Sequence, residues 1–397
     1  MAENQGSWRK KPYKTKRISW LEFGKKQVLF EENSCARKVI LNRPTRLNSL
    51  TFHMISEMLK KFKEYEKDSR VKLVILKGNG KAFCAGGDCV AVIQYCTGGH
   101  WSFGASFYRK QLILDYILAT HDKTLVSLID GVVMGGGAGL SMHGKVRVVT
   151  EKVVFAMPEA ALGLFPDVGA SYFLSRLPGF IGEYLGLTGA RLDGAEMLAC
   201  GLAIHFVHSK DLPSLEKELE NVNSKDLTIV SNVINKFIEE PSIKSTSALR
   251  SMDIINKCFS RKTVEEILSA LENEAKNGAD TWIVAAIKSM KAASPTSLKI
   301  FLRSIREGRG QGLDQCLIRE FRMASHAFRK TVNNDFYEGC RAMLFDKDKQ
   351  PKWEVAKLEL VTNEMVDQFF SKVEDDDWKD LQLDARSDEA NLVKARL

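Results

Sequence analysis

Apolar and polar positions alternate along the first half of the chain in two different periods. Between residues 53 and 66 the apolar side chains recur every three or four positions, which predicts a helix with one buried face. Leu73–Leu76 and Leu125–Ile129 are short continuous apolar runs, and such runs are typical of buried strands. Further strands are expected at Val28–Phe30 and Lys38–Leu41.

Later segments continue this alternation and then become helical. Residues 105–118 predict another helix, and residues 146–149 and 153–155 predict a strand pair around Glu151 and Lys152. Helical segments are expected at 170–177, 183–187 and 194–200, and from residue 213 onward almost everywhere. Strands that alternate with helices favour an α/β architecture followed by a helical region. No fixed-period repeat is visible, although a spiral of β-β-α turns would hide one.

These patterns divide the chain into three parts. Residues 1–25 are expected to form a basic, flexible arm, and residues 26–375 one domain with a core at 26–212 and a helical region at 213–375. Residues 376–397 are expected to form a polar tail.

Composition is that of a soluble globular protein, with 397 residues, 44% hydrophobic and 27% charged. No apolar stretch is long enough to span a membrane, and the polar, basic start has no signal-peptide core. The net charge of +8 is concentrated in residues 1–17, which hold six Lys and Arg residues against the single acid Glu3. This arm favours a solvated segment, with a nuclear-import or nucleic-acid patch as the alternative.

The eight cysteines are scattered, without a CxxC pair or a Cys/His cluster. No metal site is therefore expected, and free thiols in a reducing compartment are the default.

Two small-residue segments each follow a predicted strand. Ala82–Asp88 contains Gly86 and Gly87, and Gly131–Leu140 contains three consecutive glycines. Glycines are poor in helix interiors, but they suit a helix start that packs closely or presents free N–H groups. The second segment matches neither the GxGxxG nor the GxxxxGK[ST] pattern, and His143 stands where a GxSxG elbow needs glycine. Nucleotide phosphates and a serine hydrolase are therefore disfavoured.

Two acids lie in a third, otherwise apolar and glycine-rich segment, residues 157–169. Glu159 and Asp167 each follow a proline directly. A carboxyl in apolar surroundings has a raised pKa and can exchange protons near neutral pH. The structural alternative is that both acids cap helices or lie in a first turn.

In this order, the three segments resemble the enoyl-CoA hydratase/isomerase (crotonase) superfamily, and more closely its 3-hydroxyisobutyryl-CoA hydrolase family. Leu41–Pro44, Asp335–Ala342 and Lys352–Trp353 also match the pattern of that family. The resemblance covers roughly residues 26–375 and implies a crotonase-type spiral of β-β-α turns followed by a helical C-terminal region. It also implies an acyl-CoA substrate and no separate cofactor.

By this resemblance, the N–H groups of Gly87 and Gly136 bind the thioester oxygen. Glu159 is the central catalytic carboxylate, which either attacks the thioester or activates water, and Asp167 holds the substrate hydroxyl or assists proton transfer. Hydratases of this superfamily carry a second glutamate where this chain has Gly139. The acids therefore favour hydrolysis over hydration.

The chain departs from the family at two places. Gln111 aligns with a glutamate and keeps hydrogen bonding without charge, and Ala160 replaces a common threonine. Both changes bear on the preferred acyl group. His121, His143, Cys84 and Asp88 are expected to have structural roles.

The leading hypothesis is hydrolysis of 3-hydroxyisobutyryl-CoA in valine breakdown. The alternatives are an enoyl-CoA hydratase or isomerase, and a non-catalytic protein that binds acyl-CoA or RNA. Nucleic acid is the less favoured partner, and both a monomer and a homo-oligomer are open. Ala395-Arg396-Leu397 resembles a peroxisomal signal, with cytoplasm and mitochondrion as the alternative locations.

Overall fold

A computed structural model describes residues 26–276, 278, 280–375 and 378–386. The predicted arm and the C-terminal tripeptide lie outside these residues. The strands are β1 (Val28–Asn33), β2 (Ala36–Leu41), β3 (Leu73–Gly78), β4 (Ala82–Cys84), β5 (Thr124–Ile129), β6 (Val132–Met134), β7 (Val146–Val149), β8 (Val154–Ala156) and β9 (His205–Phe206).

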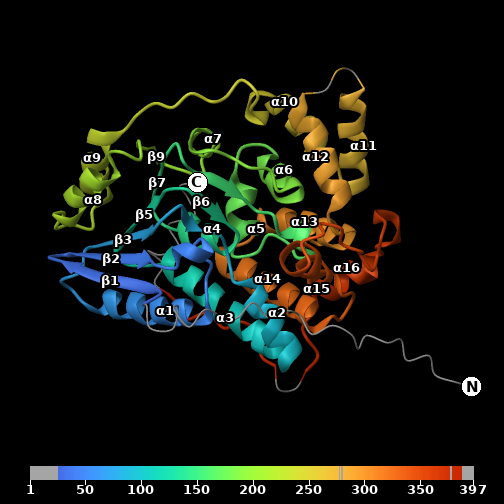
Figure 1. The fold of residues 1–397 in the computed structure, drawn as a ribbon, viewed down its shortest axis with the longest axis horizontal. Helices are drawn as coiled ribbons and strands as arrows, with labels where there is room; N and C mark the ends of the chain where they lie inside the picture. Colours follow the sequence, from blue (N-terminus) through green and yellow to red (C-terminus); the bar gives the residue numbers. More distant parts are fainter. Residues whose placement is uncertain (1–25, 277, 279, 376–377, 387–397) are drawn as a thin grey trace, which may run out of the picture.

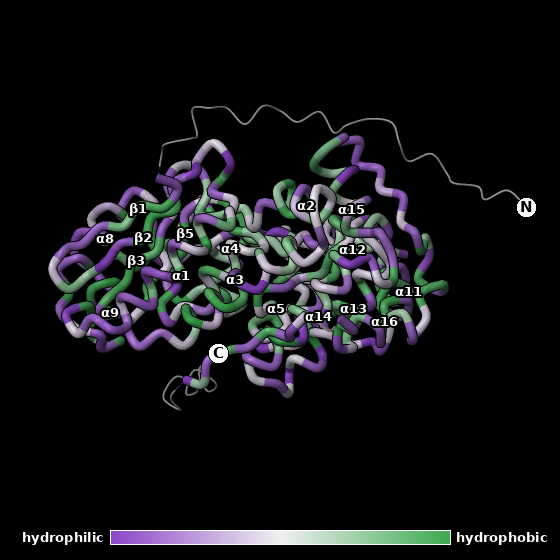
Figure 2. Tube along the Cα trace, turned by 90° about the horizontal axis from the view of Figure 1, so that it is seen from below, coloured by the Kyte–Doolittle hydropathy of each residue, from purple (hydrophilic) through white to green (hydrophobic). Residues whose placement is uncertain are grey.

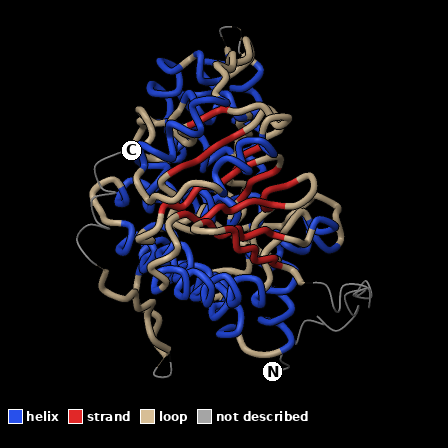
Figure 3. The backbone as a smooth tube through the Cα atoms, turned by 90° about the vertical axis from the view of Figure 1, so that its left-hand side faces the viewer, coloured by secondary structure: helices blue, strands red, loops and turns tan. Residues whose placement is uncertain are grey.

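Helices surround the strands (Figure 3). The helices of the first part are α1 (Phe52–Lys67), α2 (Cys89–Gly98), α3 (Trp101–Ala119), α4 (Gly136–Met142), α5 (Ala170–Phe173), α6 (Ile181–Thr188) and α7 (Gly194–Ala199). Those that follow are α8 (Leu212–Glu220), α9 (Leu227–Ile234), α10 (Met252–Phe259), α11 (Val264–Ala275), α12 (Thr281–Ala292), α13 (Pro295–Gly308), α14 (Leu313–Arg329), α15 (Asp335–Cys340) and α16 (Asn363–Phe370).

Successive β-β-α turns build two sheets. The larger sheet has the order β1-β2-β3-β5-β7-β9, and the smaller one has the order β4-β6-β8. Apart from the antiparallel β1–β2 pair, all pairs between these strands are parallel. The strand pairs β3/β4, β5/β6 and β7/β8 each contribute the first strand to the larger sheet and the second strand to the smaller one, whereas β1 and β2 both belong to the larger sheet. The expected α/β spiral is confirmed, and it is a structural repeat without a sequence repeat.

One expected pairing is wrong. β7 and β8 lie where two strands were predicted, but they do not pair with each other. β7 pairs with β5 and β9, whereas β8 pairs with β6. Two strands that follow closely in sequence look like a hairpin, but here the chain changes sheet between them.

Both faces of the larger sheet are buried. Leu73 and Ile75 of β3 belong to a small apolar cluster that α8 and α9 cover, whereas Val74 and Leu76 face the main core. This explains why β3 is a continuous apolar run rather than an alternating one. Figure 2 shows α8 and α9 at one end of the molecule and the C-terminal helices α11, α13, α14 and α16 at the other.

The helical region after residue 211 is not a separate body. The apolar side chains of α10–α16 share the main core with those of the spiral, and those of α8 and α9 cover the larger sheet. The described part of the polar tail also packs on this core. Trp378 stacks on Phe321 of α14 with ring centroids 5.6 Å apart, and the Arg109 guanidinium of α3 lies 4.6 Å from the Trp378 ring centroid. Among the described residues no helix is long and apolar enough to cross a membrane.

Candidate active site

The two glycine segments meet at the ends of β4 and β6. Gly86 and Gly135 have positive φ angles of 98° and 48°, which a side chain would disfavour. A Cβ atom added to Gly136 would lie 3.2 Å from the nitrogen of Gly87, so the two residues are in direct contact. Gly136 opens α4, so its N–H has no acceptor within the helix. The N–H of Gly87 donates to no acceptor among the described residues. Two neighbouring free donors can stabilise one developing oxyanion.

Close backbone packing brings the segments together. A Cβ on Gly137 would lie 2.2 Å from the carbonyl oxygen of Cys84, a contact that only glycine permits. The Cys84 thiol is buried and bonds the carbonyl oxygen of Asn48 at 3.2 Å, and burial raises its pKa to about 12. The structural role expected for Cys84 is confirmed.

Asp88 fixes the loop that carries Gly87. Its carboxylate accepts from the N–H of Ala91 at 3.2 Å as the N-cap of α2. It also forms an ion pair with Arg43 at 2.9 Å. The backbone role expected for Asp88 is confirmed, and Arg43 adds an ionic contact that was not predicted.

Glu159 lies beside the second glycine segment. It opens the short 3-10 helix Glu159–Leu162 and is 6% exposed. A Cβ on Gly135 would lie 2.7 Å from its Oε1, whereas Oε2 has no hydrogen-bond partner among the described residues. Burial, and then the charge of Asp167, raise the pKa of Glu159. The first-turn alternative describes its backbone position, and the side chain at the same time lies against Gly135, the residue before the donor Gly136.

Asp167 is buried in the same carboxyl cluster. Burial, and then the charge of Glu320, raise its pKa, and its Oδ2 has no partner among the described residues. The helix-capping alternative is wrong for this residue, because Gly169 is the N-cap of α5. Asp167 is hydrogen-bonded to α5 through its backbone: its carbonyl oxygen accepts a hydrogen bond from the N–H of Ala170 at 2.8 Å.

The turn after Asp167 is strained and held from two sides. Val168 has a φ of 55°, which is uncommon for a β-branched residue. His143 Nε2 donates to the carbonyl of Val168 at 2.8 Å, and burial lowers the pKa of His143 to about 4, so the ring is neutral. Glu320 of α14 accepts from the N–H groups of Gly169 at 2.6 Å and Ser171 at 3.0 Å. These contacts determine where Asp167 lies.

His121 also has a structural role. Its Nε2 bonds the carbonyl of Phe62 at 3.2 Å, and its Nδ1 accepts from the N–H of Lys123 at 3.3 Å. Burial lowers its pKa.

Helix α3 contributes further polar groups. Gln111 Nε2 donates to the carbonyl of Gly136 and to Asp115 Oδ1, each at 3.4 Å. Tyr108, one turn earlier, is buried, and its pKa is raised by burial first and then by the charges of Asp167, Cys89 and Glu159. Tyr108 and Asp115 were not predicted as site residues. The available signal was an acid and a tyrosine on the Gln111 face of an otherwise apolar helix.

The C-terminal region supports the segment that carries Glu159. A Cβ on Gly339 of α15 would lie 2.3 Å from the carbonyl carbon of Leu162, so α15 packs directly against this 3-10 helix. The N–H of Ser294, which caps α13, donates to the carbonyl of Ala160 at 3.2 Å. This packing gives a physical reason for the glycine in the Asp335–Ala342 motif.

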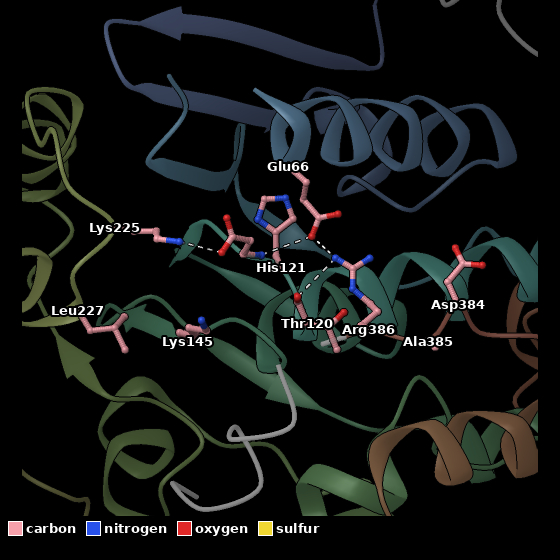
Figure 4. A pocket seen from close by; sticks show the side chains of 10 residues that line it. Glu66, Thr120, His121, Lys145, Lys225, Leu227, Asp384, Ala385 and Arg386 are labelled. Atoms are coloured by element: carbon pink, nitrogen blue, oxygen red, sulfur yellow. Dashed lines mark hydrogen bonds and ion pairs between the residues drawn. The ribbon is translucent and has the colours of Figure 1, made fainter. Parts of the chain in front are cut away.

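A separate cavity of about 490 Å³ lies away from these groups (Figure 4). It contains none of the predicted site residues, and several of its charged groups are paired with one another. Lys225 bonds Asp122 at 2.9 Å, and Arg386 pairs with Glu66. Nothing in its lining resembles the paired donors and buried acids described above. No group of three or more potential metal ligands occurs among the described residues.

Comparisons with known proteins agree with this geometry. Residues 36–370 match the enoyl-CoA hydratase/isomerase family. A protein named 3-hydroxyisobutyryl-CoA hydrolase 1 from Arabidopsis thaliana is 57% identical over 94% of this chain and 98% of its own. The mitochondrial 3-hydroxyisobutyryl-CoA hydrolase of Homo sapiens is 42% identical over 89% of this chain and 90% of its own.

Among solved structures, a carnitinyl-CoA dehydratase from Mycobacterium thermoresistibile matches with a TM-score of 0.82 and 31% identity. The match covers 91% of this chain and 100% of that one. Together with the paired glycine donors and the retained acids, these similarities show that the chain belongs to the enoyl-CoA hydratase/isomerase family and, within it, to the 3-hydroxyisobutyryl-CoA hydrolases.

Proposed function

We propose that this protein hydrolyses a short 3-hydroxyacyl-CoA thioester, with 3-hydroxyisobutyryl-CoA in valine breakdown as the first candidate. The observation that carries the proposal is the contact of Glu159 with Gly135, in the second of the two paired glycine segments, while position 139 is glycine. One acid beside two oxyanion donors suits attack on a thioester, whereas hydration in this superfamily uses a second acid at position 139. The names of the similar proteins support the same substrate.

In the proposed reaction, Gly87 and Gly136 bind the thioester carbonyl oxygen. Attack on the carbonyl carbon moves negative charge onto this oxygen, and the residues that carry the two N–H groups are in direct contact. Removal of one donor of this kind typically costs about 10²–10³ in rate. The rigid approach of β4 to α4 therefore contributes directly to catalysis.

Glu159 supplies the base or the nucleophile. In the first route it takes a proton from water while the water oxygen bonds to the carbonyl carbon. The C–S bond then breaks, and the proton passes to the sulfur to give CoA thiol and a carboxylic acid. In the second route the Glu159 carboxylate attacks the carbonyl carbon, the C–S bond breaks, and CoA leaves as a thiolate. Water then adds to the resulting anhydride and splits it into the carboxylic acid and free Glu159, and the proton released passes to the thiolate. A raised pKa suits the proton transfers of the first route near neutral pH.

Asp167 and Gln111 are proposed to recognise the acyl group. Asp167 is close enough to Glu159 to raise its pKa, and either holds the 3-hydroxyl or assists the proton transfer. Gln111 bonds the carbonyl of Gly136 and offers a neutral amide where the family has a charged group. The acyl preference is expected to depend on both side chains.

A panel of short acyl-CoAs with and without a 3-hydroxyl group tests this proposal. Thiol release from 3-hydroxyisobutyryl-CoA and 3-hydroxypropionyl-CoA, and slower release from isobutyryl-CoA, is the expected result. A protein that frees no CoA from either hydroxylated substrate would contradict the proposal. Gln111→Glu, measured on the same panel, shows how far the amide sets the acyl preference.

The same panel separates the alternatives. Hydration of crotonyl-CoA would favour the hydratase, against which Gly139 argues. Salt-sensitive RNA binding without thiol release would favour the non-catalytic binding protein.

The cellular compartment and the oligomeric state of the protein are open to direct measurement. The human relative is named mitochondrial, which does not support the peroxisomal prediction. Imaging of the full chain with and without Ala395-Arg396-Leu397 decides between the two compartments. Sedimentation of the purified chain measures whether it is a monomer or a homo-oligomer.

A further inference from the structure

A second buried acid lies beside the proposed site, on helix α3. Asp115 is fully buried, one helical turn after Gln111. Its Oδ1 accepts from Gln111 Nε2 at 3.4 Å, and its Oδ2 has no hydrogen-bond partner among the described residues. A buried polar group without a full set of partners is costly, so its presence calls for a reason.

This carboxyl occupies the space that glycine leaves free at position 139. A Cβ on Gly139 would lie 2.9 Å and 3.0 Å from the two oxygens of Asp115, and 2.7 Å from the Cβ of Val168. A glutamate at this position could not coexist with Asp115 in this packing. Position 139 therefore lacks the acid of the hydratases. Because it is glycine, it also leaves room for another acid, Asp115, which comes from α3.

The surroundings favour the protonated form of Asp115. Burial raises its pKa, and the charges of Asp167 and Glu320 act in the same direction. A neutral carboxyl still accepts a hydrogen bond through one oxygen, as Oδ1 does from Gln111.

Gln111 lies between Asp115 and the second oxyanion residue. Its NH₂ group donates both to Asp115 and to the carbonyl of Gly136. Both of these hydrogen bonds use the NH₂ group, so the amide oxygen of Gln111 remains available to accept another hydrogen bond. This Oε1 atom is buried and has no partner among the described residues.

We propose that Asp115 is a positioning residue that fixes the orientation of the Gln111 amide, so that Gln111 Oε1 is presented to the 3-hydroxyl of the acyl group. The role rests on the proposed thioester hydrolysis. Asp115 acts through Gln111 and does not itself touch the substrate. It thereby links the glycine at 139 to the choice of substrate.

The test is the ratio of kcat/KM for a 3-hydroxyacyl-CoA to that for the same acyl-CoA without the hydroxyl. Asp115→Leu has nearly the same shape and removes the acceptor. It should lower this ratio about threefold to tenfold, the size of one neutral hydrogen bond. In a Gln111→Ala background the same substitution should cause no further loss, because the amide it orients is gone.

Two further variants keep the test sharp. Asp115→Ala also removes the acceptor, with a smaller side chain, and it replaces Asp115→Leu if the latter does not fold. Asp335→Asn is the matched control, since Asp335 is a buried acid bonded to Ser294 at 2.6 Å outside the proposed site. It should leave the ratio unchanged.

The outcomes are distinguishable. An unchanged ratio in both Asp115 variants, or an equal loss with and without Gln111, overturns the positioning role while the hydrolysis stands. A wild-type chain that releases no thiol from any acyl-CoA removes the proposed function and this role with it.

Discussion

Replacement of Glu159 by glutamine changes charge and leaves shape almost intact. The side chain is 6% exposed, and its Oε1 packs close to Gly135, so the amide fits the same space. One carboxylate oxygen has no hydrogen-bond partner in the part of the chain that the structure describes, so the substitution removes no contact of that oxygen there. The Glu159→Gln substitution should therefore lower the activity and raise the stability of the protein.

Stability should rise, because the folded pKa of Glu159 is raised above its ordinary value of 4.5. Each pKa unit corresponds to about 1.4 kcal/mol of preference for the protonated form. Below the unfolded pKa both states are protonated, and the folded state has no penalty. As pH rises through the folded pKa, the wild type loses this stability and glutamine does not. The variant should therefore be more stable than the wild type at pH 8, with the difference shrinking toward pH 5.

Activity should fall by about 10²–10⁴ if Glu159 acts as a general base, and at least as far if it is the nucleophile. Thiol release from 3-hydroxyisobutyryl-CoA measures the rate, and urea unfolding followed by circular dichroism at pH 5 and pH 8 measures the stability. Both use the full chain.

Glu183→Gln is the matched control. Glu183 is also a buried glutamate, but Arg309 bonds both of its oxygens, at 2.7 Å and 2.8 Å. Its replacement should lower stability and keep activity. A Glu159→Gln protein that retains full activity, or that is less stable than the wild type at pH 8, would refute the reasoning.

Three other substitutions test the surroundings. Gly136→Ala places a methyl group 3.2 Å from the nitrogen of Gly87, and should cost about 10²-fold in kcat/KM with the fold retained; an unchanged rate would remove the oxyanion role. Gly139→Glu meets the Cβ of Val168 at 2.7 Å, so it should lower the free energy of unfolding by about 1–3 kcal/mol and create no crotonyl-CoA hydration. Glu320→Gln offers one oxygen to donors that now share two, and should lower the unfolding free energy by about 1.5–3 kcal/mol; equal thermal melts would contradict it.

Local periodicity predicted most elements because it depends on neighbours in the chain. The helix over 53–66 lies within α1, and the apolar run at 73–76 lies within β3. Helix α2 (Cys89–Gly98) and the strands β4, β6 and β9 (His205–Phe206) were missed, and β4 and β6 span only three residues each. α2 is apolar without a clear amphipathic period, and β9 spans only two residues. Pairing was the harder problem, since nothing local shows that the chain changes sheet between β7 and β8.

The sequence by itself determined the chemical groups of this protein: two glycine segments after strands, and two acids in an apolar segment. Their types and spacing carry this information because glycine lets a ligand approach the backbone donors closely, and apolar neighbours raise the pKa of a buried acid. Only the tertiary structure decided which groups meet. Asp115 occupies the space beside Gly139 from 24 positions earlier, and Glu320 binds Gly169 from 151 positions later. Such contacts depend on how α3 and α14 pack against the spiral, and no local pattern specifies them.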